Sequence, residues 1–285
     1  MYEEKIINGK EVSSIAKENI AKRVQALKEK GVAPKLSVVI VGENPASWSY
    51  VKGTKKSCAE SGLECDVISM SADVAQQELI RVIEELNADS AVHGILVQFP
   101  MPDHIDEYAV MNAISSEKDV DGFTAINVGN LNIGKDCFVP CTPQACVDML
   151  EHAGIDVVGK DVVVIGRSNT VGRPVATLLT QKSATVTICH TKTRNIAEKT
   201  RMADIIIIAI GVAGFLKADM IKEGAVVIDV GINQNSEGKL CGDADFDSCI
   251  EKVSRITPVP GGVGLMTRVN LLKNTLKSAE NAQKQ

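Results

Sequence analysis

The stretch that decides the fold of this 285-residue chain is VVVIGRSNTVG at residues 162–172. Four apolar residues lead into Gly166, and a second glycine, Gly172, follows a short polar loop and precedes helix-compatible sequence. This order is typical of a buried parallel strand that enters a tight turn and then a helix. Unpaired N–H groups and the dipole at such a helix N-terminus favour a phosphate. The spacing departs from G-x-G-x-x-G, so an ordinary strand–turn–helix is the alternative interpretation.

Strand and helix patterns alternate along the chain, which predicts parallel sheets joined by helical crossovers. In the second half, strands are expected at 162–165, 184–189, 205–210 and 225–230, with helices at 173–181, 196–199 and 218–221. In the first half, strands are expected at 36–41, 65–70 and 92–97, with helices at 12–30, 48–61, 75–87 and 107–113. Pro143 is expected to open a helix through Glu151, and a last helix follows Met266.

The pattern predicts an α/β protein with two domains. Residues 1–139 are expected to form an N-terminal α/β catalytic domain, completed by a C-terminal helix at 267–285. Residues 140–266 are expected to form a Rossmann-like, doubly wound dinucleotide-binding domain. A cleft between the two domains is the default place for a substrate.

Composition argues against several other classes of protein. The net charge of −5 leaves no basic footprint for nucleic acid. No apolar run is long enough to cross a bilayer, and residues 1–5 lack a signal-peptide pattern, so a cytoplasmic location is expected. The eight cysteines are then expected to be reduced thiols. Cys137, Cys141 and Cys146 lack C-x-x-C spacing, so no metal site is expected.

Two loops of the first half carry residues that suit ligand binding. Tyr50 offers an aromatic plane for a flat heterocycle, although a half-buried helix tyrosine is the alternative. Gln98 follows a buried strand, where open α/β sheets bind ligands, and the prolines after it stiffen its loop. Asp119 or Asp121 could accept paired N–H donors from an amino-heterocycle, although solvated loop acids are common.

Eight motifs occur in one order along the chain. In the first half they are Ser49-Tyr50-Val51, Val97 to Pro102, Lys118 to Gly122, and Pro140 to Pro143. In the second half they are Gly166 to Ser168 with Val171 to Pro174, Asp229 to Ile232, Gly242-Asp243, and Thr257 to Gly264. Together they resemble the bifunctional methylenetetrahydrofolate dehydrogenase/methenyltetrahydrofolate cyclohydrolase family over essentially the whole chain.

The resemblance implies a homodimeric enzyme that oxidises 5,10-methylenetetrahydrofolate to the 5,10-methenyl form, in the one-carbon metabolism that serves purine biosynthesis. It implies that residues 1–139 bind the folate. The implied catalytic residues are Tyr50, position 54, Lys56, Gln98 and Asp121. The implied folate contacts are Tyr50, Gln98, Pro100, Asp121, Gly262 and Leu265. The implied cofactor contacts are Gly166, Arg167, Ser168, Val171, Gly172, Thr191 and Ile232.

The most important departure from the family pattern is Thr54. The family has a lysine at this position, which is the key group of the cyclohydrolase step, and a second lysine that corresponds to Lys56. A threonine hydroxyl cannot replace an ammonium that moves protons. We therefore expect dehydrogenase activity with weak or absent cyclohydrolase activity. The alternative is a fully bifunctional enzyme in which Lys55 or Lys56 supplies the amine.

Two smaller departures are Ala145, where the family has glycine, and Leu265, where it has proline. Ala145 adds a methyl group near a helix start. Leu265 lies beside glycines expected to face the folate, so it could change the rigidity of that loop.

Cofactor choice follows from the end of the second strand at 184–189. A strict NAD site has an acidic residue there for the ribose hydroxyls. This chain instead has His190, Lys192 and Arg194, and Arg167 lies in the glycine-rich loop. These side chains favour a 2′-phosphate, and hence NADP over NAD.

Two rival classes are a non-catalytic folate- or nucleotide-binding protein and a dehydrogenase of a small acid. The first predicts decay of the motifs, but the phosphate loop, Gln98, Asp121 and Gly262 are all retained. The second predicts an acid/base histidine or lysine in the cleft, and neither His104 nor His152 shows a partner in the sequence.

Overall fold

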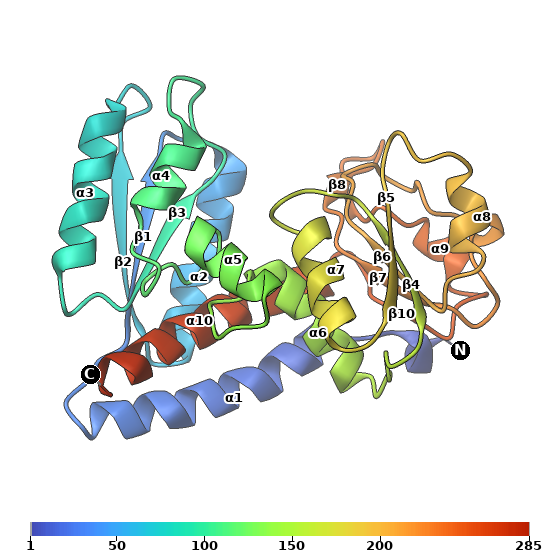
Figure 1. Ribbon diagram of the computed structural model, residues 1–285, viewed down its shortest axis with the longest axis horizontal. Coiled ribbons are helices and arrows are strands. Elements are labelled where there is room, and N and C mark those ends of the chain that lie inside the picture. The colour runs from blue at the N-terminus through green and yellow to red at the C-terminus, as the bar shows by residue number, and fades with distance from the viewer. Residues whose placement is uncertain (1, 285) are drawn as a thin grey trace. The chain divides into compact units, whose positions relative to one another are not determined.

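The computed structural model describes residues 2–284 and divides the chain into two compact units. One unit combines Ile15–Val139 with residues 268–284. The other combines Pro140–Thr267 with residues 2–14. Both are built on parallel sheets, so the predicted α/β class is confirmed. Figure 1 labels the elements of each unit.

The unit around Ile15–Val139 holds a three-stranded parallel sheet in the order β2-β1-β3. Its elements are α1 (Gly9–Lys28), β1 (Lys35–Val41), α2 (Pro45–Glu60), β2 (Glu64–Met70), α3 (Gln76–Ala88), β3 (Gly94–Gln98), α4 (Glu107–Ala113) and α5 (Ala125–Asn132). α10 (Val263–Ala282) supplies the residues from Arg268 onward.

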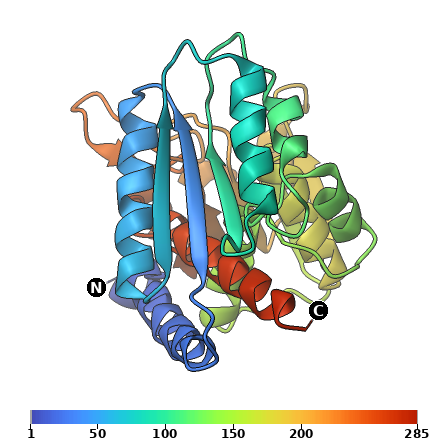
Figure 2. The same ribbon diagram turned by 90° about the vertical axis from the view of Figure 1, so that its left-hand side faces the viewer.

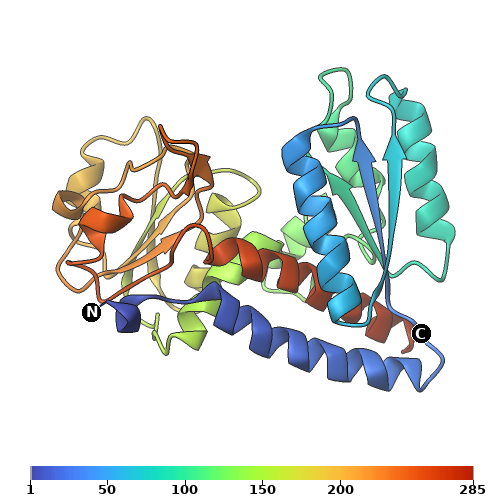
Figure 3. The same cartoon turned by 180° about the vertical axis from the view of Figure 1, so that it is seen from behind.

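Alternate side chains of this sheet face different helices, because successive residues of a strand point to opposite faces. Val39 and Val97 pack in one apolar cluster with Leu79 of α3 and Val110 of α4. The other face receives α2, which contacts β1 and β2. Figures 2 and 3 show α2 and α3 flanking the sheet from two sides.

The unit around Pro140–Thr267 holds a five-stranded parallel sheet in the order β10-β7-β6-β4-β5. Its strands are β4 (Asp161–Ile165), β5 (Thr185–Cys189), β6 (Ile205–Ile208), β7 (Val226–Asp229) and β10 (Arg255–Ile256), with a short hairpin of β8 (Asn233–Gln234) and β9 (Leu240–Cys241). Its helices are η1 (Glu3–Lys5), α6 (Cys141–His152), α7 (Gly172–Gln181), α8 (Ile196–Thr200), η2 (Ala218–Met220) and α9 (Phe246–Cys249).

This second sheet is covered on both faces, as the doubly wound prediction requires. Val163 and Ile165 share a cluster with Ile196 of α8 and Phe246 of α9. α7 contacts β4 and β5, the strands on either side of the crossover that it makes.

Several element boundaries differ from the prediction because capping residues, and not apolar periodicity, set them. α2 begins at Pro45, before the expected Trp48, because the Asn44 side chain accepts hydrogen bonds from Ala46 N and Ser47 N. α6 begins at Cys141, so that Pro143 lies within its first turn, where a missing N–H costs little.

Six short elements were not predicted, namely η1, α5, β8, β9, α9 and β10. α5 is short, and the Thr124 hydroxyl, which accepts from Asn127 N, caps it. β10 has only two residues, too few for any periodic pattern.

Candidate active site

The turn between β1 and α2 orients the helix that carries Tyr50. Asn44 caps the first turn through its side-chain oxygen, at 3.0 Å from Ala46 N and 3.1 Å from Ser47 N. Trp48 Nε1 donates to Gly42 O at 3.2 Å, which ties the helix back to the end of the strand. Tyr50 lies in the second turn of α2 and is half-buried.

Thr54 lies one turn after Tyr50, on the face of α2 that packs toward the sheet. Its side chain is fully buried, and its Oγ1 has no hydrogen-bond partner within residues 2–284. Lys55 is exposed. Lys56 is 79% exposed and lies 3.9 Å from Glu60. Each residue of a helix is rotated by about 100° from the one before it. The side chains of Lys55 and Lys56 therefore leave the helix on different faces from the side chain of position 54.

The unpaired Thr54 hydroxyl leads to a prediction about the free energy of unfolding. We expect Thr54→Val to raise the free energy of unfolding by about 1 kcal/mol, because it removes a buried polar group that makes no hydrogen bond and keeps the side-chain volume. Urea unfolding measures this change. Thr54→Ala is the control, because it also removes the hydroxyl but leaves a cavity and should be less stable than Thr54→Val by about 1 kcal/mol. A loss of stability in Thr54→Val would contradict the prediction.

Gln98 is the last residue of β3 and pairs in register with Ile40 of β1. It is half-buried, and its Nε2 donates to Phe99 O at 2.6 Å. Pro100, after the cis Phe99–Pro100 peptide bond, is exposed. Gln98 therefore lies at the carboxyl edge of the sheet, where α/β proteins place ligands.

Asp119 and Asp121 both lie in the segment between α4 and α5. Asp119 is buried and accepts hydrogen bonds from Gly122 N at 2.9 Å, from Thr124 N at 2.8 Å and from the Asn127 side chain at 2.8 Å. These bonds occupy its carboxylate, so Asp119 shapes the loop. Asp121 is half-buried and lines a narrow pocket with Phe99 and Phe123. Spacing alone left the two acids equivalent, and the structure shows that the Asp119 carboxylate is held within its own loop.

Gly262 and Leu265 belong to the other unit, at the start of α10. A Cβ on Gly262 would lie 2.5 Å from Pro258 O, so only glycine fits this close backbone approach. Leu265 N donates to Gly262 O at 3.2 Å. A proline at 265 has no N–H for this bond, so the departure from the family pattern changes how the glycine-rich turn is held.

The loop between β4 and α7 requires two glycines, because backbone atoms pack closely against both of them. A Cβ on Gly166 would lie 2.3 Å from Ala209 O, and one on Gly172 would lie 2.3 Å from Gly166 O. Ser168 Oγ accepts from Val171 N at 3.1 Å and from Gly172 N at 3.3 Å. Its own hydrogen remains available as a donor. The loop thus offers a hydroxyl donor beside the N-terminus of α7, an arrangement that suits phosphate.

Cationic and neutral side chains surround this loop. Arg167 is exposed, and its guanidinium makes no hydrogen bond or ion pair with the rest of the described chain. The end of β5 lies beside the loop, because Gly166 N donates to Cys189 O at 2.9 Å. Beyond that end, Thr191 and Lys192 are exposed. No acidic residue stands at 190–194 to exclude a 2′-phosphate.

Two buried carboxylates order the loops after β6 and β7. Asp229 accepts from the backbone N–H groups of Gly231, Asp243 and Ala244 at 2.8–3.0 Å. Burial raises the pKa of Asp229 to about 6, against the lowering effect of these three donors. Asp243 accepts from the N–H groups of Ile210, Gly211 and Val212, and from the Asn233 side chain.

These carboxylates hold the segment that carries Ile232, whose side chain is 68% exposed. Gly231 and Gly242 allow the close approach, since a Cβ on Gly231 would lie 2.3 Å from Asp243 and one on Gly242 1.9 Å from Asp229. Asp229 and Gly242 also line a pocket of about 470 Å³ at this edge of the sheet. The sequence motifs included this segment. They did not predict that Asp229 and Asp243 would hold it in place through hydrogen bonds to the backbone.

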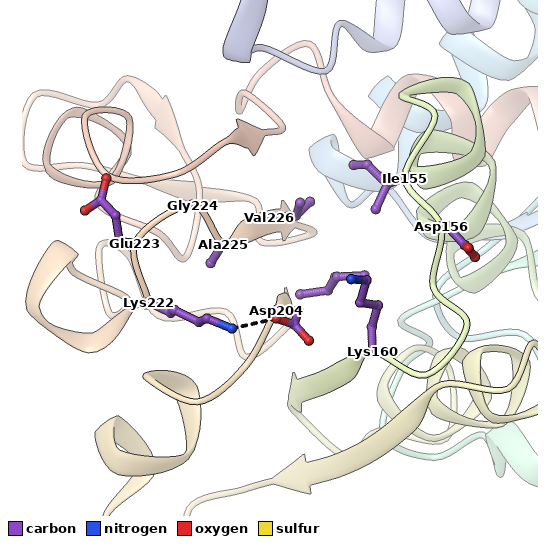
Figure 4. A pocket seen from close by; sticks show the side chains of 10 residues that line it. Ile155, Asp156, Lys160, Asp204, Lys222, Glu223, Gly224, Ala225 and Val226 are labelled. Atoms are coloured by element: carbon purple, nitrogen blue, oxygen red, sulfur yellow. Dashed lines mark hydrogen bonds and ion pairs between the residues drawn. The ribbon is translucent and has the colours of Figure 1, made fainter.

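A different pocket, of about 170 Å³, lies at the amino ends of the same strands (Figure 4). Figure 4 shows Lys222 paired with Asp204, at 2.7 Å. Asp204 also accepts from Asp161 N at 3.1 Å, so its carboxylate is already occupied. Ligands of parallel α/β sheets bind at the carboxyl ends of the strands, and the loop predicted to bind the cofactor lies there.

Comparison with known proteins decides the family. A model of the tetrahydrofolate dehydrogenase/cyclohydrolase catalytic domain matches residues 7–121, and one of the NAD(P)-binding domain of the same enzymes matches residues 140–283. The chain belongs to the tetrahydrofolate dehydrogenase/cyclohydrolase family. The predicted resemblance is therefore confirmed. The bifunctional protein FolD of Bacillus subtilis strain 168 is 52% identical over 275 residues, which cover 96% of this chain and 97% of that relative.

Solved structures of the family agree with the fold. The bifunctional enzyme from Campylobacter jejuni is 49% identical with a TM-score of 0.96, and covers 97% of this chain and 98% of its own. The methylenetetrahydrofolate dehydrogenase-cyclohydrolase of Trypanosoma brucei, whose structure is a complex with NADP cofactor and an inhibitor, is 38% identical with a TM-score of 0.94 and covers 98% of both chains.

Among residues 2–284, no three histidine, cysteine or acidic side chains lie close enough together to hold a metal ion. No helix in that range has the length and apolar character that crossing a membrane requires.

Proposed function

We propose that this protein oxidises 5,10-methylenetetrahydrofolate to 5,10-methenyltetrahydrofolate with NADP. The observation that carries the proposal is the loop from Gly166 to Gly172, in a chain whose two units match the catalytic and NAD(P)-binding models of one family. Ser168 Oγ presents a donor beside the start of α7, and Arg167 presents an unpaired guanidinium. Both suit the phosphates of a dinucleotide.

The folate is assigned to the residues at the carboxyl edge of the β2-β1-β3 sheet. Tyr50 stacks on the folate. Asp121 binds the edge of the pterin ring that carries the amino group, and Gln98 lies beside the reacting carbon. Pro100 lines the same loop, and Gly262 and Leu265 contribute a glycine-rich turn. The geometry of Asp119 supports this assignment, because its hydrogen bonds fix the loop in which Asp121 lines a narrow pocket.

The proposed oxidation requires little acid–base catalysis from the side chains. Loss of a hydride from the one-carbon bridge leaves a cation that the two flanking nitrogens share, so no strong general base is required. Binding, orientation and exclusion of water supply most of the catalysis. When bound, NADP supplies the ring that accepts the hydride. Thr191, Val171 and Ile232 are assigned to the walls of its site, and the acid-free end of β5 favours NADP over NAD.

Cyclohydrolase activity, which the Campylobacter jejuni and Trypanosoma brucei relatives carry in their names, is not proposed for this chain. Thr54 is buried where the family has its key lysine. The rival interpretation needs Lys55 or Lys56 to take over, but both are exposed and Lys56 is turned to Glu60. We propose that the methenyl product is released unhydrolysed.

We further propose a cytoplasmic homodimer that supplies one-carbon units to purine biosynthesis. Family membership supports this, and size-exclusion chromatography with light scattering tests the oligomeric state. The rival class, a non-catalytic binding protein, is disfavoured because the phosphate loop, Gln98 and Asp121 all retain ordered positions at the sheet edges.

One assay tests the proposed reaction. Purified protein is given 5,10-methylenetetrahydrofolate with NADP, then with NAD, and reduced cofactor and methenyl product are recorded separately. We expect both to rise together with NADP, and the methenyl compound to decay at its uncatalysed rate. No reduced cofactor with either nucleotide would refute the dehydrogenase. Reduced cofactor without accumulating methenyl compound would show that another group replaces the lysine.

A further inference from the structure

Arg268 is a cation of the unit that holds α2. It lies in the second turn of α10 and is half-buried. Within residues 2–284, its guanidinium makes neither a hydrogen bond nor an ion pair. An arginine carries five N–H donors in a planar fork, and leaving them unused in a half-buried position is costly.

The guanidinium lies directly against Gly53 of α2. A Cβ on Gly53 would lie 2.1 Å from Arg268 Nη1 and 3.3 Å from Cζ. Any side chain at position 53 would therefore displace the arginine, so the glycine makes room for it. Gly53 immediately precedes Thr54 and lies three residues after Tyr50. Residues three apart on a helix are surface neighbours, so Arg268 lies one helical turn from the assigned stacking ring.

The surroundings of this arginine carry a positive charge. Lys52, Lys55 and Lys56 lie on the exposed parts of the same helix segment. The charge of Arg268 acts on Glu60, whose carboxylate is already paired with Lys17 Nζ at 2.8 Å. The cations Lys17, Lys56 and Arg268 all lower the pKa of Glu60, Lys17 most strongly. This patch stands out in a chain of net charge −5 and suits an anion.

We propose that Arg268 binds a carboxylate of the glutamyl tail of the folate substrate and so selects glutamylated folates. This inference rests on the proposed function. The glutamyl carboxylates are the anionic groups of a folate, and they are joined to the pterin through the ring system that Tyr50 is assigned to stack upon. A guanidinium fork matches a carboxylate with two parallel hydrogen bonds. The phosphate loop that is assigned to the cofactor belongs to the other unit.

The test compares substrates that differ only in the tail. Initial rates are measured with 5,10-methylenetetrahydropteroate, which has no glutamate, and with 5,10-methylenetetrahydrofolate carrying one or three glutamates. We expect the wild type to show a KM about tenfold lower for the glutamylated substrates, equivalent to about 1.4 kcal/mol. Arg268→Met should abolish the difference, and Arg268→Lys should retain part of it, because it keeps the charge but loses the fork.

Gly53→Ala supplies an independent variant that leaves every charge in place. Its methyl group must push the guanidinium away, so the preference for glutamylated substrate should fall as in Arg268→Met. Alanine is a better helix former than glycine, so α2 itself should not weaken. The double variant should lose no more preference than either single variant. Lys22→Met, at an exposed lysine of α1, is the control for loss of one positive charge and should keep the wild-type preference.

Three outcomes would overturn the inference. An unchanged substrate preference in Arg268→Met would remove the arginine from the tail site. An equal loss for pteroate and glutamylated substrates would assign it a structural role. A rise in KM confined to NADP would assign it to the cofactor. Calorimetric titration of the same folates without cofactor separates this inference from the proposed reaction, because tail binding would persist even if no dehydrogenase activity were found.

Discussion

Thr54→Lys should give this chain a methenyltetrahydrofolate cyclohydrolase activity that we propose the wild type to lack. The wild-type hydroxyl is buried and can neither carry a positive charge nor move protons at neutral pH. A positioned acid–base group contributes on the order of 10²–10⁴-fold to a proton-transfer step, so we expect hydrolysis of the methenyl compound to rise about 100-fold or more above the uncatalysed rate. The decay of methenyl absorbance in the absence of nucleotide measures this directly.

The control for Thr54→Lys must separate charge from size. Thr54→Met places a side chain of similar reach at the same position without an ammonium group, and it should not gain hydrolysis. Urea unfolding should accompany the assay, because a longer side chain has to leave the buried face of α2 to reach water. Two results would count against our interpretation of position 54. One is hydrolysis by the wild type, and the other is a well-folded Thr54→Lys protein with no gain.

Arg167→Gln should be the substitution that most reduces the preference for NADP. The Arg167 guanidinium is exposed and unpaired in the loop between β4 and α7, beside the acid-free end of β5. Hydrogen bonds to charged groups contribute about 1.5–3 kcal/mol, so the KM for NADP should rise by about 10- to 100-fold. The KM for NAD, which lacks the 2′-phosphate, should change little. Initial rates with each nucleotide at saturating folate measure the two constants.

Arg173→Gln is the matched control for this prediction. Arg173 lies six residues further along the same loop and helix, but its guanidinium donates to Asn169 Oδ1 at 2.9 Å. Its replacement should affect both nucleotides alike. Equal losses for NADP and NAD in Arg167→Gln would show that the arginine supports the loop and does not read the 2′-phosphate.

The sequence predicted helices and strands correctly where an apolar pattern was followed by a recognisable turn. The apolar run at 162–165 and the glycine that follows it predicted β4 and its turn, because a strand buried on both faces must be apolar throughout. The helix at 107–113 was predicted to the residue. The start of α2 was not, because the Asn44 cap is a single polar residue whose role depends on the helix that follows it.

What the sequence by itself determined is the α/β class, the family, and the identity of the residues at each loop. These follow from short-range patterns and ordered motifs that survive without knowledge of the fold. Only the tertiary structure decided that Asp119 is held by backbone N–H groups of its own loop, that the Thr54 hydroxyl is buried without a partner in the described chain, and that Arg268 lies against Gly53. The physical reason is that burial and side-chain pairing depend on segments far apart in the chain, whose approach no local pattern records.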